Sequence, residues 1–397
     1  MNHAKGVFLY DDQGHKVLDG ISSWWCCHHG HRHPKLLEAL QQQSNKLVHV
    51  SLAGITHSLA EDLADRLSDL TQLPYVFFSD NGSTSIEVAL KMCWQRWALK
   101  KQSKRQLIVG FNKGYHGDTL ACMSAGNTDF HQEYATHFHQ ALYMPSPSLG
   151  EECLTALKKT LKERADECAC VVIEPLLQAA GGMLVHEPEI LKEIYLLCQQ
   201  YDTPLIADEI AVGLGRCGAL WGCQRAGFTP DILCTSKGLT GGMLPLAATC
   251  VSEEIASDFM HANNPEQCFN HGHTYTGHPL ASAVAMASLD LVEEEGFLPH
   301  CRELETMLHK ELPKFDEEIP LASSRQMGTV GIVELDVEKT SPLMPYFREM
   351  IKKGYFLRPL DNIAYFWPPL CITVDEYKEM LDVSRETLKE IYTSSHV

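Results

Sequence analysis

Short apolar runs alternate with longer amphipathic segments through the first three quarters of the chain. The segments between several of these runs have helical spacing, as in 59–70 and in Ser85 to Lys100. Strands that alternate with helices predict a mainly parallel sheet with helices on both faces, because parallel neighbours need crossover connections. The apolar runs are typical of strands buried on both faces, and they lie at 75–79, 107–111, 170–174, 204–208, 231–235 and 245–251.

The pattern changes after a long helix that the sequence predicts from Pro279 to Glu295. Shorter elements follow, and they predict a second, smaller α+β unit. Residues 6–20 read as a hairpin around an Asp- and Gly-containing turn, and we expect its strands to join the sheet of that unit. The elements after the long helix are a helix at 298–312, strands near 328–335 and 355–358, and a final helix at 374–392. The expected organisation is a large domain of 21–292 and a discontinuous small domain of 1–20 with 293–397.

Charge and hydropathy narrow the class of protein. The formal net charge of −18 in 397 residues argues against nucleic acid or an anionic membrane as partner. No apolar run approaches the ~20 residues that span a bilayer. The start at Met1 to Gly6 lacks the apolar core of a signal peptide. We therefore expect a cytoplasmic protein.

Fifteen cysteines are scattered along the chain, and their odd number does not indicate a disulfide framework. The densest cluster of thiols and imidazoles runs from Cys26 to His33. It lacks the C-x2–4-C spacing of zinc sites. The sequence therefore predicts a buried turn with packed thiols and histidines, and no metal.

Two of the apolar runs end in groups that can do chemistry. Asp208 ends the run 204–208, and Lys237 follows the run 231–235. Because the carboxyl ends of parallel strands meet at one edge, we expect a carboxylate and an amine there. This pair suits pyridoxal phosphate, with the amine forming a Schiff base and the acid pairing with the pyridinium nitrogen. A solvated turn lysine is the alternative for Lys237, but its position favours burial, which lowers the pKa.

A small polar turn after the run 75–79 is a candidate phosphate cradle. Gly82 and Ser83 precede an expected helix, and Thr84 with Glu87 fits a capping box. Free backbone N–H groups at a helix start bind phosphate. An ordinary capped helix is the alternative.

Three other residues are candidates for contact with such a cofactor. Tyr115 follows the run 107–111 and could stack on a flat ring, or be a core tyrosine in a turn. Glu174 ends the run 170–174, where it could touch the edge of the cofactor. Thr274 precedes the long helix and could donate to a phosphate, or cap the helix.

Longer segments around these residues resemble a known family. The stretches 205–218 (LIADEIAVGLGRCG) and 230–238 (PDILCTSKG) resemble the class III aminotransferases of fold type I, and the likeness covers nearly the whole chain. Asp19 to Trp25 (DGISSWW), with Gly114 to Asp118 (GYHGD) and Leu357 to Pro359 (LRP), resembles the 7,8-diaminopelargonic acid aminotransferase subgroup of biotin synthesis.

The resemblance implies a fold, a cofactor and an assembly. The fold would be α/β, with a mainly parallel seven-stranded sheet in the large domain. Pyridoxal phosphate would be the cofactor of a ping-pong aminotransferase, with Lys237 as the amine and proton carrier and Asp208 at the ring nitrogen. The enzyme would be a homodimer with active sites at the subunit interface. The remaining cofactor contacts implied are Gly82, Ser83, Tyr115 and, from the other subunit, Thr274.

The resemblance also implies substrates. The amino acceptor would be 8-amino-7-oxononanoate and the donor S-adenosylmethionine. Arg358 would pair with the acceptor carboxylate, because a guanidinium binds a carboxylate in two places. Arg216 would help one site to accept both substrates. The remaining substrate-binding residues implied are Trp24, Trp25, Gly272 and Tyr365.

Two alternatives remain open. Another class III enzyme would use an ω-amino acid or a diamine as donor. It is favoured by His273, where the subgroup usually has proline, and by the lack of a counterpart to the subgroup's N-terminal tyrosine before the hairpin. Trp24, Trp25 and Arg358 favour the biotin-pathway subgroup. The second alternative is a non-catalytic relative, against which the presence of both Asp208 and Lys237 argues.

Overall fold

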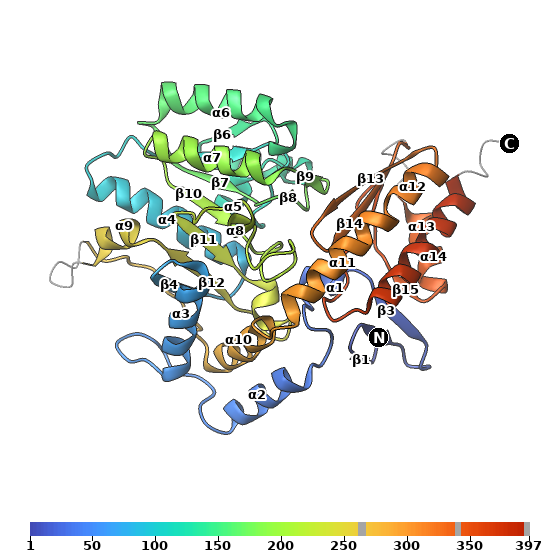
Figure 1. The fold of residues 1–397 in the computed structure, drawn as a ribbon. Coiled ribbons are helices and arrows are strands. Elements are labelled where there is room, and N and C mark those ends of the chain that lie inside the picture. The colour runs from blue at the N-terminus through green and yellow to red at the C-terminus, as the bar shows by residue number, and fades with distance from the viewer. Residues whose placement is uncertain (261–266, 338–342, 393–397) are drawn as a thin grey trace.

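A seven-stranded sheet forms the centre of the larger part of the molecule (Figure 1). The computed structural model describes residues 1–260, 267–337 and 343–392. Strand β12 runs antiparallel to both of its neighbours, and the other neighbouring pairs are parallel. The mainly parallel α/β sheet that the sequence predicts is confirmed. Its strands, in spatial order, are β4 (Tyr75–Ser79), β12 (Ala247–Val251), β11 (Ile232–Thr235), β10 (Leu205–Asp208), β7 (Cys168–Ile173), β5 (Leu107–Phe111) and β6 (Ala141–Met144).

Alternate residues of the central strands pack into different cores, because side chains in a strand point to opposite faces. In β7, Val171 and Ile173 join the core under α6 (Glu151–Arg164) and α7 (Pro188–Gln200). Cys170 and Val172 join the core under α4 (Gly82–Leu99) instead. Both faces are therefore covered by helices, which explains why the strands are apolar throughout.

A second group of helices covers the β4–β12–β11 side of the sheet. Helix α10 (Pro279–Val292) packs on both α2 (Pro34–Ser44) and α3 (Ser58–Thr71). The core between α3, α10 and the sheet takes Leu233, Ala248 and Cys250 from the strands. No helix in the described part of the chain is both long and apolar enough to cross a membrane.

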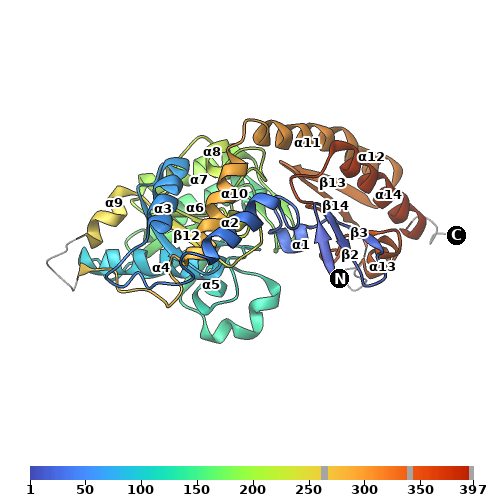
Figure 2. The same cartoon turned by 90° about the horizontal axis from the view of Figure 1, so that it is seen from below.

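A smaller lobe lies beside the large sheet (Figure 2). It contains a three-stranded sheet, β13 (Ala322–Met327), β14 (Val330–Leu335) and β16 (Ile363–Phe366), and the helices α11 (Phe297–Glu311), α12 (Pro313–Glu318), α13 (Met344–Lys352) and α14 (Val374–Tyr392). The N-terminal strands form their own sheet in the order β1 (His3–Lys5), β2 (Phe8–Tyr10), β3 (Lys16–Asp19) and β15 (Tyr355–Phe356).

The N-terminal hairpin therefore joins the C-terminal part of the chain, as expected, through parallel pairing of Leu18 with Tyr355. One expectation is wrong: 328–335 and 355–358 do not share a sheet with each other. A turn at Gly328, with φ of 53°, joins β13 to β14. This second hairpin pairs through β14 with β16 and not with β15, which pairs with β3. The boundaries of the two domains at 20/21 and 292/293 stay a prediction.

Two local expectations are corrected. Helix α4 begins at Gly82 rather than at Ser85, because Asn81 caps it and forms the capping box with Thr84. Glu87 is not part of that box, since its carboxylate accepts from Ala121 N at 3.1 Å. Strand β6 was not evident from hydropathy, because three of its four residues are only half-buried at the sheet edge.

The remaining elements are short. They are α1 (Ser22–Trp25), α5 (Leu120–Ala125), α8 (Gly222–Arg225), α9 (Glu253–Ala256), β8 (Leu177–Gln178), β9 (Leu184–Val185), and the 3-10 helices η1 (Asp129–His137), η2 (Pro147–Leu149), η3 (Lys237–Thr240) and η4 (Ser257–Phe259).

Candidate active site

A cavity of about 470 Å³ opens at the carboxyl ends of the parallel strands. This is where α/β sheets of this kind bind ligands, and the volume is that of a small-molecule site. Its walls come from the end of β4 and the start of α4, from the end of β10, and from the turn after β11. Six of the residues that line it carry the argument below: Trp25, Ser83, His116, Glu174, Asp208 and Lys237.

Asp208 is the last residue of β10 and is almost completely buried. Its Oδ2 lies 2.7 Å from Nδ1 of the buried His116, and its Oδ1 accepts from Ile210 N at 3.2 Å. Burial lowers the pKa of His116, but the hydrogen bond and charge of Asp208, with the charge of Glu174, outweigh it and raise the pKa. The pair therefore places a carboxylate, with an imidazole behind it, at the cavity wall.

Lys237 lies two residues beyond β11, as the first residue of η3. Its φ of 43° is in the left-handed region, which costs a non-glycine residue about 1–3 kcal/mol and persists only when the surroundings hold it. The ammonium group faces the cavity, 4.8 Å from the centroid of the Trp25 ring. Burial lowers the pKa of Lys237, although Asp208 and Glu174 oppose this. The amine is therefore easier to deprotonate than an exposed lysine.

Glu174 follows β7 and is buried beside the same cavity. Its two oxygens accept from Tyr115 N and from Ala179 N, each at 3.0 Å. Burial raises the pKa of this carboxyl to about 7, against the lowering effect of His116. Glu174 therefore fixes the backbone of Tyr115, whose side chain also lines the cavity.

The N-terminus of α4 forms another part of the cavity lining. Gly82 and Ser83 are in the first turn, where backbone N–H groups have no partner within the helix. Gly117, with φ of 115°, approaches so closely that an added Cβ would lie 2.0 Å from Ser83 Oγ. The close approach leaves the first turn of α4 facing the cavity, as a phosphate cradle requires.

These residues fit the cofactor that the sequence predicts. The cavity presents an amine, a buried carboxylate and a helix N-terminus from three different elements, η3, β10 and α4. The buried Nε2 of His116 has no hydrogen-bond partner within the described structure, as expected of a site whose polar ligand completes it. Pyridoxal phosphate needs one group of each of these three kinds.

Of the expected substrate-binding residues, Trp25 alone lines this cavity. It is buried, and its ring stacks on Trp367 at 5.1 Å and meets the edge of Tyr365 at 6.2 Å. Trp24, in contrast, is 59% exposed, and the exposed Arg358 holds its guanidinium 5.1 Å from the Trp24 ring. The two adjacent tryptophans thus point into different environments.

Three other expected residues lie outside the cavity of a single chain. Arg216 is completely buried and donates to Pro368 O at 2.8 Å and to Thr329 Oγ1 at 3.2 Å. Gly272 and Thr274 are exposed, in the segment before α10. Their roles in binding stay predictions.

Sequence reasoning singled out neither His116 nor Cys26. His116 belongs to the segment 114–118. Its position next to Tyr115, shortly after a buried strand, could have indicated that it lies in the site. Cys26 was assigned to a packed turn, yet its side chain lines the cavity. Cys26 directly follows Trp25, which was expected in the substrate pocket, and this neighbour could have indicated its place in the cavity.

Comparisons with known proteins agree with this geometry. The family model described as aminotransferase class-III matches residues 1–388. The adenosylmethionine-8-amino-7-oxononanoate aminotransferase of Geobacter sulfurreducens is 37% identical, over 96% of this chain and 89% of the relative. The enzyme of the same name from Synechococcus elongatus is 38% identical, over 98% of this chain and 94% of the relative.

Solved structures give the same result. The crystal structure of adenosylmethionine-8-amino-7-oxononanoate aminotransferase from Methanocaldococcus jannaschii superposes with a TM-score of 0.93 and 32% identity, covering 98% of this chain and 92% of that one. An amine transaminase from an uncultivated Pseudomonas species, in its PLP-bound form, superposes with a TM-score of 0.92 and 28% identity, covering 98% and 94%. The chain therefore belongs to the class III aminotransferases, a family of enzymes that depend on pyridoxal phosphate.

Proposed function

We propose that the enzyme converts 8-amino-7-oxononanoate to 7,8-diaminononanoate with S-adenosylmethionine as amino donor, a step of biotin biosynthesis. The proposal is supported by the two relatives of that name, which match nearly the full chain. The structural observation that carries it is the aromatic wall beside the amine. Trp25 lies between Lys237 on one side and Tyr365 with Trp367 on the other. Such a wall suits the long aliphatic chain of the acceptor.

Lys237 is the proposed proton carrier. When bound, pyridoxal phosphate supplies a ring that withdraws electrons from the carbon bearing the transferred amine. The Nζ of Lys237 would take the proton from that carbon and return it on the cofactor side, as general base and then general acid. The lowered pKa of Lys237 brings the neutral amine closer to physiological pH, which favours proton abstraction.

Asp208 is the proposed partner of the ring nitrogen, and His116 its positioning residue. One oxygen of Asp208 is held by His116 at 2.7 Å and the other by Ile210 N at 3.2 Å, so the carboxylate cannot swing away. Its negative charge would keep the ring nitrogen protonated. At the start of α4, Gly82 and Ser83 would hold the phosphate with their backbone N–H groups, and Tyr115 would stack on the ring.

The other residues predicted to bind the cofactor or the substrate lie outside the cavity of one chain, and their proposed roles follow. We place Gly272 and Thr274 in a homodimer, where exposure on one chain lets Thr274 reach the phosphate of its partner. Arg358 would receive the acceptor carboxylate, with Trp24 holding its guanidinium through a cation–π contact. Arg216, buried behind Trp367 at 5.4 Å, would act by supporting that wall.

A second candidate function is transamination of an ω-amino acid or diamine donor. It is favoured by the likeness to the Pseudomonas amine transaminase, which is nearly as close in structure as the archaeal enzyme. It is also favoured by the exposure of Arg358 and Trp24, because neither residue lines the cavity of one chain and so neither restricts the substrate there.

A half-reaction screen tests the two candidates. The purified, cofactor-loaded enzyme is mixed with S-adenosylmethionine, lysine, β-alanine or 4-aminobutyrate, and the visible absorption of the cofactor is followed. We expect S-adenosylmethionine to bleach the band, and subsequent 8-amino-7-oxononanoate to restore it with formation of the diamine, detected by mass spectrometry. Bleaching by the ω-amino acids alone would reject the biotin-pathway assignment. If lysine bleaches the band and the diamine then forms, the proposed acceptor is retained and the donor is lysine instead of S-adenosylmethionine.

A further inference from the structure

The backbone at Lys237 is strained, and one turn of the chain packs directly against it. This turn, residues 26–31, follows α1 and lies in the cluster of thiols and imidazoles that the sequence singles out. Lys237 has a φ of 43°, in the left-handed region, and a residue keeps such a conformation only where its surroundings hold it. An added Cβ at Gly238, the next residue, would lie 2.8 Å from Nδ1 of the buried His28. The turn after α1 is therefore well placed to hold Lys237.

A chain of two hydrogen bonds connects His29 of this turn to η3. Nε2 of His29 lies 2.9 Å from Oγ of Ser288, a completely buried residue of α10, and that hydroxyl donates to Gly238 O at 3.1 Å. Because the hydroxyl proton points to the carbonyl, Nε2 of His29 is the donor to Ser288. Gly238 O also accepts from Gly241 N at 2.9 Å, within the same short helix. Ser288 therefore fixes the residue that directly follows Lys237.

This chain of hydrogen bonds depends on a neutral imidazole. Burial lowers the pKa of His29 to about 3, with the charge of His33 acting in the same direction and the bond with Ser288 opposing both. The ring is therefore neutral near pH 7, and its single proton lies on Nε2. The support that His29 gives to η3 should not vary as the pH changes around neutrality.

His28 connects η3 to the segment that follows Asp208. Its Nε2 donates to Leu214 O at 2.7 Å, beyond the end of β10. Leu214 also has a left-handed backbone, with φ of 57°. The other nitrogen of the ring, which packs on Gly238, has no hydrogen-bond partner within the described structure. One side chain thus braces both of the segments that carry Lys237 and Asp208.

The N-terminal strands hold the far end of the turn. His31 exchanges two backbone hydrogen bonds, of 2.7 and 3.1 Å, with Gly6, which lies between β1 and β2. The ring of His31 lies between Cys27 Sγ, 3.7 Å from Nδ1, and Asp19 Oδ2, 2.8 Å from Nε2. Asp19 is the last residue of β3 and is completely buried. The turn is therefore fixed by contacts that do not involve η3, as a support for η3 requires.

We propose that His28 and His29 are positioning residues for Lys237, with Ser288 as the link between His29 and η3. They hold the backbone after Lys237 so that its amine faces the cavity, and none of the three lines the cavity. The inference rests on the proposed function, in which Lys237 carries the proton. A displacement of 1 Å at a reacting group can cost about 10²-fold in rate. Loosening this support should therefore lower kcat and leave KM unchanged.

The test compares two buried serines of α10. Ser288→Ala removes the link to Gly238 O. Ser282 is just as buried on the same helix, and its hydroxyl has no hydrogen-bond partner in the described part of the chain, so Ser282→Ala is the matched control. Hydrogen–deuterium exchange of the cofactor-loaded enzyme, measured on a peptide spanning 237–242, reports how firmly η3 is held. We expect about fivefold faster exchange in Ser288→Ala, the loss of one hydrogen bond, and no change in Ser282→Ala.

Kinetics and cofactor spectra show whether the support matters to Lys237. Ser288→Ala should lower kcat about 5- to 10-fold with KM unchanged, and His29→Leu about 10- to 100-fold. His29→Gln, whose amide nitrogen can donate to Ser288, should recover most of the rate. His28→Leu, which cannot donate to Leu214 O, should lower kcat as well. The visible circular dichroism of the bound cofactor should weaken in the same order, and it needs no substrate.

Three results would overturn the proposal. They are unchanged exchange at 237–242 in Ser288→Ala, equal losses of kcat in Ser288→Ala and Ser282→Ala, and no recovery of rate in His29→Gln. A failure of the proposed function looks different. The kcat is measured with whichever donor bleaches the cofactor, so a change of donor leaves the positioning role standing. If Lys237→Ala still transaminates, the role of Lys237 is wrong, while the exchange difference still decides whether Ser288 holds η3.

Discussion

The two ends of the cavity are built in different ways. At the cofactor end, Asp208 and Lys237 leave neighbouring strands of the sheet and face a cavity with buried walls. At the end where we propose that the substrate binds, Trp24 of α1 and Arg358 are exposed, and Thr274, exposed on one chain, is proposed to act in a dimer. The order of the strands within one chain is enough to bring Asp208 and Lys237 together. The residues proposed to select the substrate are exposed on one chain, so variants at the two ends should have effects of different kinds and sizes.

The largest effect is expected at Lys237. Lys237→Ala should reduce kcat by at least 10²–10⁴-fold, which is what a positioned general acid and base contributes. Lys237→Arg should be no better, because a guanidinium keeps its charge and cannot act as the base. Steady-state kinetics and mass spectrometry for covalently trapped cofactor after borohydride reduction provide the measurement. A Lys237→Ala enzyme that retains transamination would show that the cofactor end does not depend on this amine.

Asp208→Asn should have the next largest effect. Losing a preorganised charge at the reacting group costs about 10²–10³-fold in kcat. The matched control is Asp231→Asn. Asp231 precedes β11, at the amino ends of the strands and away from the cavity, and its carboxylate accepts a hydrogen bond from Leu205 N at 2.8 Å. The control should keep kcat within about twofold of the parent. Equal losses in both variants would mean that the carboxylates matter for folding rather than for the ring nitrogen.

Two buried carboxyls follow neighbouring strands of the sheet, Glu174 after β7 and Glu209 after β10. Glu174 faces the cavity and Glu209 does not. Burial raises the pKa of each from 4.5 to about 7, although each accepts two backbone N–H groups. Because the folded state holds the proton more tightly, the stabilisation is full below pH 4.5. It is lost as pH rises towards 7, by about 3 kcal/mol per group.

Thermal unfolding from pH 4.5 to 8 measures this dependence. Glu174→Gln and Glu209→Gln should each flatten the decline in stability with rising pH. Only Glu174→Gln should also change kcat, since Glu209 lies outside the cavity lining. An unchanged pH profile in both variants would show that neither carboxyl holds its proton in the folded enzyme.

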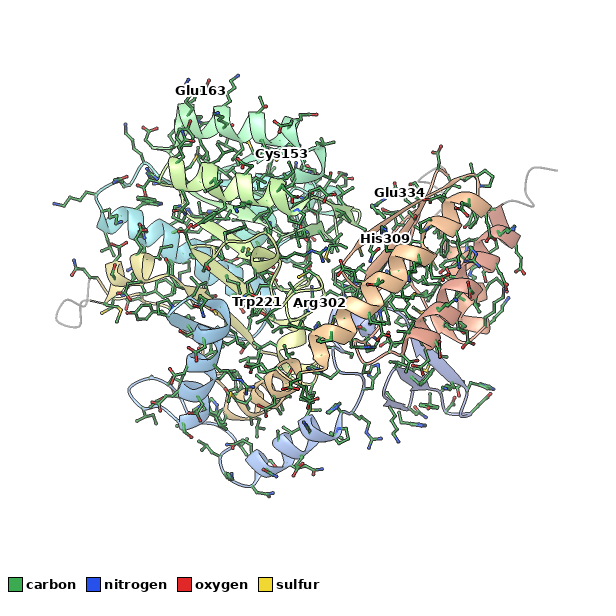
Figure 3. The ribbon with its side chains drawn as sticks, in the orientation of Figure 1. Cys153, Glu163, Trp221, Arg302, His309 and Glu334 are labelled. Atoms are coloured by element: carbon green, nitrogen blue, oxygen red, sulfur yellow. The ribbon has the colours of Figure 1, made fainter. Side chains whose placement is uncertain are left out.

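The smallest effect is expected at the open end. Arg358→Ala should raise the KM for the carboxylate-bearing acceptor about five- to tenfold with little change in kcat, because an exposed ion pair contributes about 1 kcal/mol. Arg302→Ala, on the exposed face of α11 (Figure 3), should change neither parameter. A large fall in kcat for Arg358→Ala would mean that Arg358 is buried against the reacting groups in the working enzyme.

The same division explains how far the sequence could predict the structure. Strands such as 107–111 were correct to the residue, because burial on both faces leaves a continuous apolar run. Asp208 and Lys237 followed from their places after such runs. Edge strand β6 was missed because half-burial leaves no such pattern. The start of α4 was misplaced because the side-chain hydrogen bonds that decide a cap do not depend on hydropathy.

Long-range contacts were the least predictable from sequence. Nothing near His116 indicates that its partner is Asp208, which lies in another βα unit. Likewise, nothing near Cys27 and His31 indicates that Asp19 lies behind the imidazole. The residues of the substrate end, such as Arg358, were proposed from resemblance, since an exposed arginine has no signature of its own.

Strand β12 has a consequence for how the enzyme is made. The turn proposed to hold the phosphate follows β4, and the neighbour of β4 in the sheet is β12, which comes far later in the chain. On the ribosome, β4 and the start of α4 emerge long before β12, so β4 has no partner strand while residues 80–246 are made. Closing so long a loop is slow. A chain arrested before β12 would therefore carry Asp208 and Lys237 while β4, which leads into the turn at Gly82, still lacked its neighbour in the sheet.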